Sequence, residues 1–184
     1  MPTEFHLRLA QDRDIDAIAT LIPLAVRELS EPFYSPREIE RAVAHVFGVD
    51  RQLISDRTYF VAELDGQIVG CGGWSRRKTI FGGDQTTFKE ASDQALDPRV
   101  DAARIRAFFV HPQFARRGIG RAILIACESA AREAGFRKLE LIATLPGEPL
   151  YRACGYRSVS PFLIAMPDGS TLPAVRMDKS IGLP

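Results

Sequence analysis

The feature that most constrains this chain is an apolar strand that runs through a short turn into a helix opened by glycines. The strand covers residues 105–110, the turn carries Arg116 and Arg117, and Gly118 and Gly120 open the helical run. A helix start leaves about four backbone N–H groups without partners and carries partial positive charge. Glycines also let an anion approach the backbone closely. The segment therefore predicts a cradle for phosphate at the end of a central strand.

Two common phosphate-binding motifs do not fit this spacing. A P-loop requires a lysine and a hydroxyl residue directly after its last glycine, and neither Gly118 nor Gly120 is followed by that pair. A dinucleotide fingerprint requires a third glycine at the position that Ile123 occupies. The context still favours a cradle over an ordinary loop, because Arg121 adds a third cation and the apolar residues that follow recur at helical spacing.

The turn resembles motif A of the GNAT superfamily, the acyl-CoA-dependent N-acetyltransferases. The usual form of that motif, Q/R-x-x-G-x-G/A, falls on residues 115–120, with Gly118 and Gly120 in register. Ala115 stands where Gln or Arg is usual, so a side-chain contact from that position is lost. The backbone amides that would hold a pyrophosphate do not depend on it.

A second segment is similar to the motif B signature of the same superfamily, A-x-x-L/F-Y-x-x-x-G-F. It covers residues 147–156, with Tyr151 and Gly155 in register and Gly147 in place of the usual alanine. The resemblance, which extends from about Leu53 to Val159, implies that Tyr151 donates a proton to the thiolate of CoA. No basic residue is spaced to activate Cys154 as a nucleophile, and the superfamily transfers directly between substrates.

The resemblance implies a single GNAT-like domain over residues 1–184, in the α/β (α+β) class. Its mixed, mostly antiparallel sheet would be splayed at the centre and flanked by helices. Acetyl-CoA would be the co-substrate, with pantetheine paired to the backbone of one strand and the pyrophosphate held by the turn. The cofactor-binding residues expected from this match are Phe108, Phe109, Val110, Arg116, Arg117, Gly118, Ile119, Gly120 and Arg121.

The predicted activity is direct transfer of an acetyl group from acetyl-CoA to a primary amine of a small molecule or peptide. A protein acetyltransferase that acts on lysine or an N-terminus is an alternative, and so is a non-catalytic acyl-CoA-binding sensor. The general base is left open. His111 is expected in a turn or phosphate-proximal role, a water relay is compatible with the chain, and the carboxylate candidates are Glu63, Asp84, Asp101 and Glu140.

Amino-acid composition limits which binding partners and which cellular location we expect for this protein. The 184 residues are 46% hydrophobic, enough for a full core, and 24 Lys+Arg against 23 Asp+Glu give no basic field for nucleic acid. The three cysteines are widely spaced, so we expect neither disulfides nor a metal site. The N-terminus lacks a signal-like pattern and no long apolar run is present. We expect a cytoplasmic protein without a membrane partner, and a homodimer stays open.

The pattern along the chain predicts the element order β-α-α-β-β-β-α-β-α-β-β. Pro23 is expected to kink or divide the first helix, and Ser35 to Glu38 form a capping box for the second. Asp65-Gly66 is typical of a tight hairpin. The central strand is expected at residues 103–110.

The segment from Arg77 to Asp97 is too long for an ordinary hairpin connection. Such connections are commonly functional lids or solvated insertions. Phe81 and Phe88 favour a role in binding, since a purely solvated loop has little use for two phenylalanines. We therefore expect this segment to be mobile and to select the acceptor.

Overall fold

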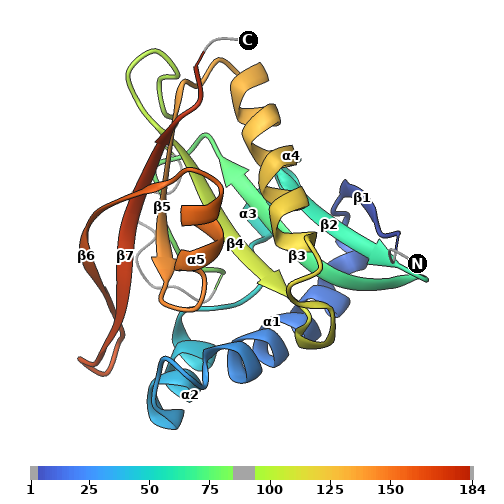
Figure 1. Cartoon of the computed structure of the whole chain (residues 1–184), viewed down its shortest axis with the longest axis vertical. Coiled ribbons are helices and arrows are strands. Elements are labelled where there is room, and N and C mark those ends of the chain that lie inside the picture. The colour runs from blue at the N-terminus through green and yellow to red at the C-terminus, as the bar shows by residue number, and fades with distance from the viewer. Residues whose placement is uncertain (1–3, 85–93, 183–184) are drawn as a thin grey trace.

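The computed structural model describes residues 4–84 and 94–182, and its centre is one seven-stranded sheet in the order β1-β2-β3-β4-β5-β7-β6 (Figure 1). The strands are β1 (His6–Leu9), β2 (Tyr59–Leu64), β3 (Gln67–Ser75), β4 (Ala103–Val110), β5 (Lys138–Thr144), β6 (Arg157–Ala165) and β7 (Thr171–Ser180). The helices are α1 (Ile15–Ser30), α2 (Pro36–His45), α3 (Arg51–Ser55), α4 (Ile119–Glu133) and α5 (Glu148–Ala153), with 3₁₀ turns η1 (Asp12–Asp14) and η2 (Pro112–Phe114). The predicted fold class is confirmed, and the element order matches the prediction except for one additional helix, α3.

The sheet divides between β4 and β5. These two strands are the parallel pair in a sheet whose other neighbours are antiparallel, and they are joined at only two residue pairs, Ala103 with Leu139 and Arg104 with Glu140. Beyond that point β4 stays paired with β3, and β5 stays paired with β7 along its whole length. The predicted splay therefore leaves one edge of residues 105–110 without a partner strand.

A bulge bends β4 beside this opening. Ala107 has a φ of 57°, and the pairing register with β3 shifts between Cys71 and Gly73. Positive φ is uncommon for a residue other than glycine. The hydroxyl of the fully buried Tyr59 lies 3.2 Å from the carbonyl oxygen of Ala107, to which it donates. Burial raises the pKa of Tyr59, so this hydroxyl keeps its proton and the bulge keeps its support.

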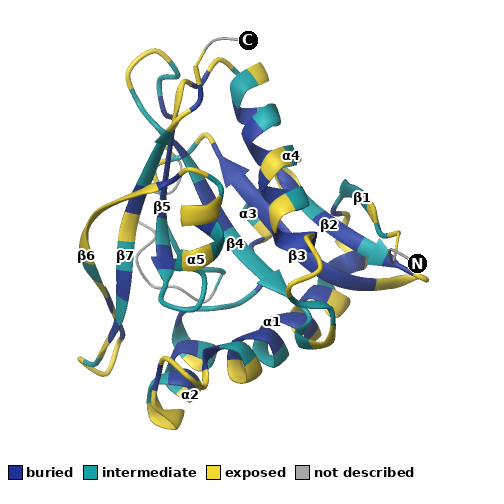
Figure 2. Ribbon diagram, in the orientation of Figure 1, coloured by how far each residue is buried: buried dark blue, intermediate teal, exposed yellow. Residues whose placement is uncertain are grey.

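Two hydrophobic layers cover the two faces of the sheet (Figure 2). Helices α1 and α2 pack on one face, and α4 packs on the other. Glycines in β3 let α4 approach closely, because a Cβ at Gly70 would lie 2.6 Å from Cγ2 of Ile119 and one at Gly72 would lie 2.9 Å from Cγ2 of Ile123. The beginning of α4 is thereby fixed above β3 and β4.

The predicted helix cap and hairpin turn are both present in the structure. The capping box of Ser35 with Glu38 begins α2, and Asp65 and Gly66 both have positive φ in the turn between β2 and β3. Pro23 lies within α1 and does not divide it, which corrects one of the two expected outcomes. Helix α3, which begins after the capping side chain of Asp50, was not predicted.

Tyr34 connects the helical layer of α1 and α2 to the half of the sheet that contains β5 and β7. Its buried hydroxyl donates to the carbonyl oxygen of Pro173 at 2.6 Å and accepts the N–H of Leu145 at 2.9 Å. Pro173 belongs to β7 and Leu145 follows β5, whereas Tyr34 lies between α1 and α2. One hydroxyl therefore connects the α1 layer to the half of the sheet that has parted from β4.

We expect Tyr34→Phe to lower the free energy of unfolding by about 1–3 kcal/mol, because it leaves a partly buried N–H and a partly buried carbonyl without their partner. Urea denaturation followed by circular dichroism measures this change. The denaturant slope should stay the same, since the surface exposed on unfolding is unaltered. A loss below about 0.5 kcal/mol, within the range of an ordinary surface substitution, would contradict the proposed link.

Candidate functional site

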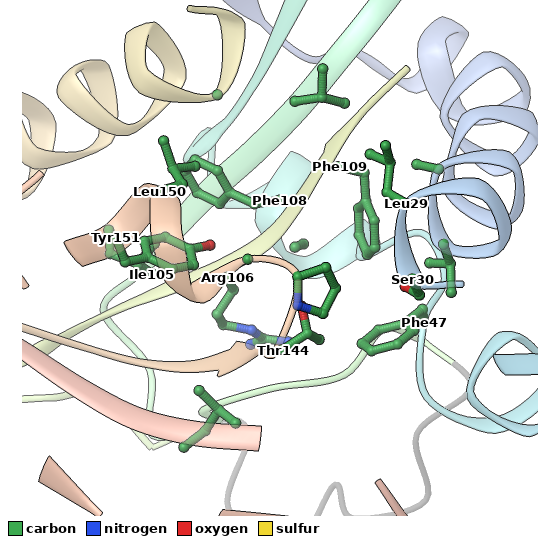
Figure 3. A pocket seen from close by; sticks show the side chains of 18 of the residues that line it. Leu29, Ser30, Phe47, Ile105, Arg106, Phe108, Phe109, Thr144, Leu150 and Tyr151 are labelled. Atoms are coloured by element: carbon green, nitrogen blue, oxygen red, sulfur yellow. The ribbon is translucent and has the colours of Figure 1, made fainter. Parts of the chain in front are cut away.

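A cavity of about 580 Å³ lies where β4 and β5 part, and it reaches both faces of the sheet (Figure 3). Successive side chains of a strand point to opposite faces. Accordingly, Phe108 faces Leu150 and Tyr151 on one side of β4, and Phe109 faces Phe47 on the other. The cavity therefore connects a pocket beside α4 and α5 with a pocket beside α1.

The turn before α4 presents free donors at one end of this cavity. The backbone N–H groups of six consecutive residues, 116–121, make no hydrogen bond within the described part of the chain. Arg116 and Gly118 both have positive φ, at 64° and 86°, which curls the turn at the start of the helix. Consecutive N–H groups in such a turn, next to a helix N-terminus, form a binding site for an anion.

The three arginines of this turn do not act alike. Arg116 and Arg121 line the cavity together with Ala115, Gly118 and Gly120. The guanidinium of Arg117 instead lies over the ring of Phe114, 5.3 Å from its centre, and Arg117 is not among the lining residues. The backbone of the predicted cradle is thus in place, and two of its three expected cations face the cavity.

Tyr151 brings a hydroxyl group to the same cavity. It lies on α5 with its hydroxyl directed toward the opening beside β4 (Figure 3). The ring packs edge-on against Phe108 and Tyr156, with ring centres 6.0 and 5.7 Å away. Burial raises the pKa of Tyr151 above its ordinary value. Within residues 4–84 and 94–182 no group hydrogen-bonds this hydroxyl, so its proton is available to a ligand.

The strand residues predicted to face the cofactor also border the opening. Phe108, Phe109 and Val110 line the cavity, and their strand edge toward β5 has no partner. Unpaired N–H and carbonyl groups of such an edge can pair with an extended ligand as they would with a strand. The structure thus brings the predicted strand, turn and tyrosine around one space.

Arg106 is the functional residue that the sequence analysis missed. Its guanidinium is buried and donates to Oδ2 of Asp50 at 2.5 Å and to the carbonyl oxygen of Gly82 at 2.6 Å. Desolvation raises the pKa of Asp50 and lowers that of Arg106, while their mutual attraction opposes both changes. An arginine between apolar residues of a central strand was the available signal, because a buried charge requires a partner.

The carboxylates considered as general bases are held elsewhere. Glu140 is paired with Arg104 and Arg176 on neighbouring strands. Glu63 is paired with Arg8. None of these side chains lines the cavity that the described residues form.

The other candidates are likewise engaged in local structure. Oδ2 of Asp84 forms a salt bridge with Nη1 of Arg51 at 2.9 Å, and Oδ2 of Asp101 accepts a hydrogen bond from the backbone N–H of Asp97. Nδ1 of His111 accepts the N–H of Gln113 at 3.3 Å, which caps η2. His111 thus has the turn role that was one of its two expectations. Within the described residues, the cavity is lined by neither a carboxylate nor an imidazole.

The first part of the long segment forms a wall of the cavity. Arg77 forms a bridge with Ala95, the N–H of Gly83 donates to Val46, and the N–H of Asp84 donates to Val49. The mobility expected of the segment from Arg77 to Asp97 stays a prediction. Phe81 lines the cavity and meets Phe162 edge-on at 5.7 Å. Phe88, the other phenylalanine of the prediction, lies outside the described residues.

Two further searches were made of the residues that the structure describes. No group of three or more His, Cys, Asp or Glu side chains is arranged to hold a metal ion. No helix combines the length and apolar character needed to cross a membrane.

Comparison with known families gives the same result as the geometry. The sequence model described as the acetyltransferase (GNAT) family matches residues 23–156. This chain belongs to the acetyltransferase (GNAT) family. No curated protein matches it.

Solved GNAT structures share its fold at low sequence identity. A GCN5-related N-acetyltransferase from Rhodopseudomonas palustris is 19% identical with a TM-score of 0.73, and 98% of each chain is covered. The PaiA N-acetyltransferase from Thermoplasma acidophilum, solved in complex with coenzyme A, is 13% identical with a TM-score of 0.64, covering 97% of this chain and 99% of that one. A ribosomal-protein-alanine N-acetyltransferase from Brucella melitensis is 18% identical with a TM-score of 0.62, covering 96% and 99%.

Proposed function

We propose that this GNAT protein transfers an acetyl group from acetyl-CoA directly to a primary amine of a small molecule or peptide. The observation that carries the proposal is the placement of three groups around one cavity. These are the free N–H groups of residues 116–121, the unpaired edge of β4, and the hydroxyl of Tyr151. The solved PaiA N-acetyltransferase with coenzyme A supports the choice of cofactor.

The cofactor would be held mainly by backbone. Its pyrophosphate would accept hydrogen bonds from the turn before α4, with Arg116 and Arg121 adding charge. Pantetheine would pair with Phe108 to Val110 like an added strand. A main-chain N–H near Phe109 would then donate to the thioester carbonyl, where negative charge develops as the amine attacks.

Tyr151 would complete the transfer by protonating the leaving thiolate. The amine nitrogen would form a bond to the acetyl carbon, the C–S bond would break, and the nitrogen would lose a proton to water. The sulfur would gain the proton of Tyr151, and solvent would then return a proton to the Tyr151 oxygen. In water a phenol with a pKa of about 10 gives its proton to a thiolate, of pKa about 8.5, only slightly uphill. Burial raises the pKa of Tyr151, which keeps the proton on its oxygen until the thiolate forms beside it.

The cavity itself favours a neutral, nucleophilic amine. Desolvation lowers the pKa of an amine, because the charged form loses its hydration. An ammonium ion would therefore release its proton to water on the way into the apolar cavity. This route requires no carboxylate or imidazole beside the acceptor.

The function is tested by steady-state release of CoA thiol with a panel of small amines, peptides and proteins. Turnover with amines or peptides supports the proposal. Turnover only with folded proteins would favour a protein acetyltransferase. Tight binding of acetyl-CoA without turnover of any acceptor would indicate an acyl-CoA sensor, against which the free hydroxyl of Tyr151 argues.

Gly118→Val should weaken acetyl-CoA binding while the protein remains folded, because Gly118 lines the cavity and a larger residue there would hinder close approach of the pyrophosphate to the backbone. Gly169→Val is a matched control, since both glycines have similar positive φ (86° and 82°) and open space where a Cβ would lie. The two variants therefore carry the same backbone strain, and Gly169 is in the β6–β7 turn. Calorimetric titration should show a loss of affinity for Gly118→Val only. Equal affinities would disprove the cradle.

Tyr151→Phe should lower kcat by about 10²–10⁴-fold, the range typical of a general acid, with little change in acetyl-CoA affinity. The ring and its packing are kept, and only the proton donor is removed. Tyr156→Phe is the control, because Tyr156 packs against the same ring and does not line the cavity. Full turnover by Tyr151→Phe with a substrate whose chemistry limits the rate would assign this residue to packing alone.

The pH dependence follows from the same assignments. The pKa of Tyr151 is raised by burial, so the acid stays protonated up to and above pH 10. The free-base fraction of an alkyl amine rises tenfold per pH unit below its own pKa of about 10. We expect log kcat/KM to rise with a slope near one from about pH 6.5 to about pH 9. A plateau beginning near pH 7 would reveal a protein base instead.

A further inference from the structure

The part of the cavity beside α1 is walled by apolar side chains from distant parts of the chain. Val26 and Leu29 come from α1, Phe47 follows α2, Phe81 comes from the long segment, and Ile164 comes from β6. Phe109 completes this wall from β4, with its ring centre 5.9 Å from that of Phe47 (Figure 3). This half of the cavity lies across β4 from Tyr151, so it is where an acceptor would be placed.

The electrostatics of the cavity are unequal at its two ends. The charged side chains that line it, among the residues described, are Arg106, Arg116 and Arg121. Arg116 and Arg121 belong to the anion cradle, and Arg106 is already neutralised by Asp50. The polar side chains nearer the acceptor half are hydroxyls: Ser30, which is buried and bonded through its side chain to no described residue, and Thr144.

We propose that the acceptor is a monoamine with an apolar, uncharged body, of the alkyl or arylalkyl class. This inference rests on the proposed acetyl transfer and names its substrate class. A second ammonium group would leave its hydration shell and find no carboxylate among the described residues that line the cavity, and an unpaired buried charge is strongly unfavourable. A carboxylate beside the amine would require a free cation, whereas Arg106 is committed to Asp50 and Gly82.

Two matched pairs of amines test this class. Hexylamine and 1,5-diaminopentane have the same number of non-hydrogen atoms and differ by a terminal methyl in place of an ammonium group. 2-Phenylethylamine and phenylalanine differ by a carboxylate beside the amine. We expect kcat/KM to favour the uncharged-body member of each pair by about 100-fold or more, as sites do when a buried group is left unpaired.

A negative charge introduced at Leu29 tests the apolar wall directly. Leu29 is half-buried, so a polar side chain can be accommodated there. Leu29→Glu would supply a carboxylate to a distal ammonium group, whereas Leu29→Gln has nearly the same shape without the charge. Relative to Leu29→Gln, Leu29→Glu should shift the preference toward 1,5-diaminopentane by about tenfold or more, as expected for a charge-assisted contact. Circular dichroism and an unchanged KM for acetyl-CoA verify that both variants are folded.

The outcomes separate this inference from the function on which it rests. Acetyl transfer that favours 1,5-diaminopentane or phenylalanine would overturn the substrate class and leave the acetyltransferase proposal standing. Absence of transfer to all four amines would count against the proposed activity on small amines. In that case titration of the same amines into the CoA complex still decides the class, because tighter binding of hexylamine supports it, and equal or absent binding overturns it.

Discussion

The cavity of this molecule depends on the separation of two parallel strands after two residue pairs. Each strand keeps its antiparallel partner on the other side, β3 for β4 and β7 for β5, so neither half of the sheet loses its own ladder. What is lost is pairing along the inner edges. A backbone N–H or carbonyl group that is buried away from water without a hydrogen-bond partner destabilises the folded protein. The opening is therefore suited to a ligand with its own amide groups, and the proposed pantetheine has them.

Buried polar groups hold the opening in shape. The Tyr59 hydroxyl supports the bulge at Ala107, and the Arg106–Asp50 pair ties β4 to the start of α3 and to the wall at Gly82. Buried ion pairs contribute little net stability, because desolvation opposes their attraction. Their value here is positional. Removing either partner would leave the other charge buried and unpaired. Because Arg106 also donates to the carbonyl oxygen of Gly82, the pair holds the loop that carries Phe81 beside β4.

The two ends of the cavity obtain their character in different ways. Positive potential at the turn before α4 comes from the Arg116 and Arg121 side chains together with backbone N–H groups at a helix N-terminus. The end beside α1 obtains its apolar character from side chains. If acetyl-CoA lies between the two ends, its phosphates would accept hydrogen bonds from the turn before α4. Its thioester carbon would then lie in the apolar, poorly hydrated part of the cavity. That arrangement strengthens hydrogen bonds to a developing oxyanion.

The fold and the turn before α4 could be predicted because their signals are local. Caps, turns and glycines such as Ser35, Gly66 and Gly118 act within a few residues of themselves, and each is seen in the structure. The acceptor wall could not be predicted, since Leu29, Phe47 and the rest are far apart in the sequence and each fits an ordinary core equally well. Pro23 shows the same limit, because packing of α1 overrides the local preference for a break. Only the division of the sheet turns such core side chains into the walls of a cavity.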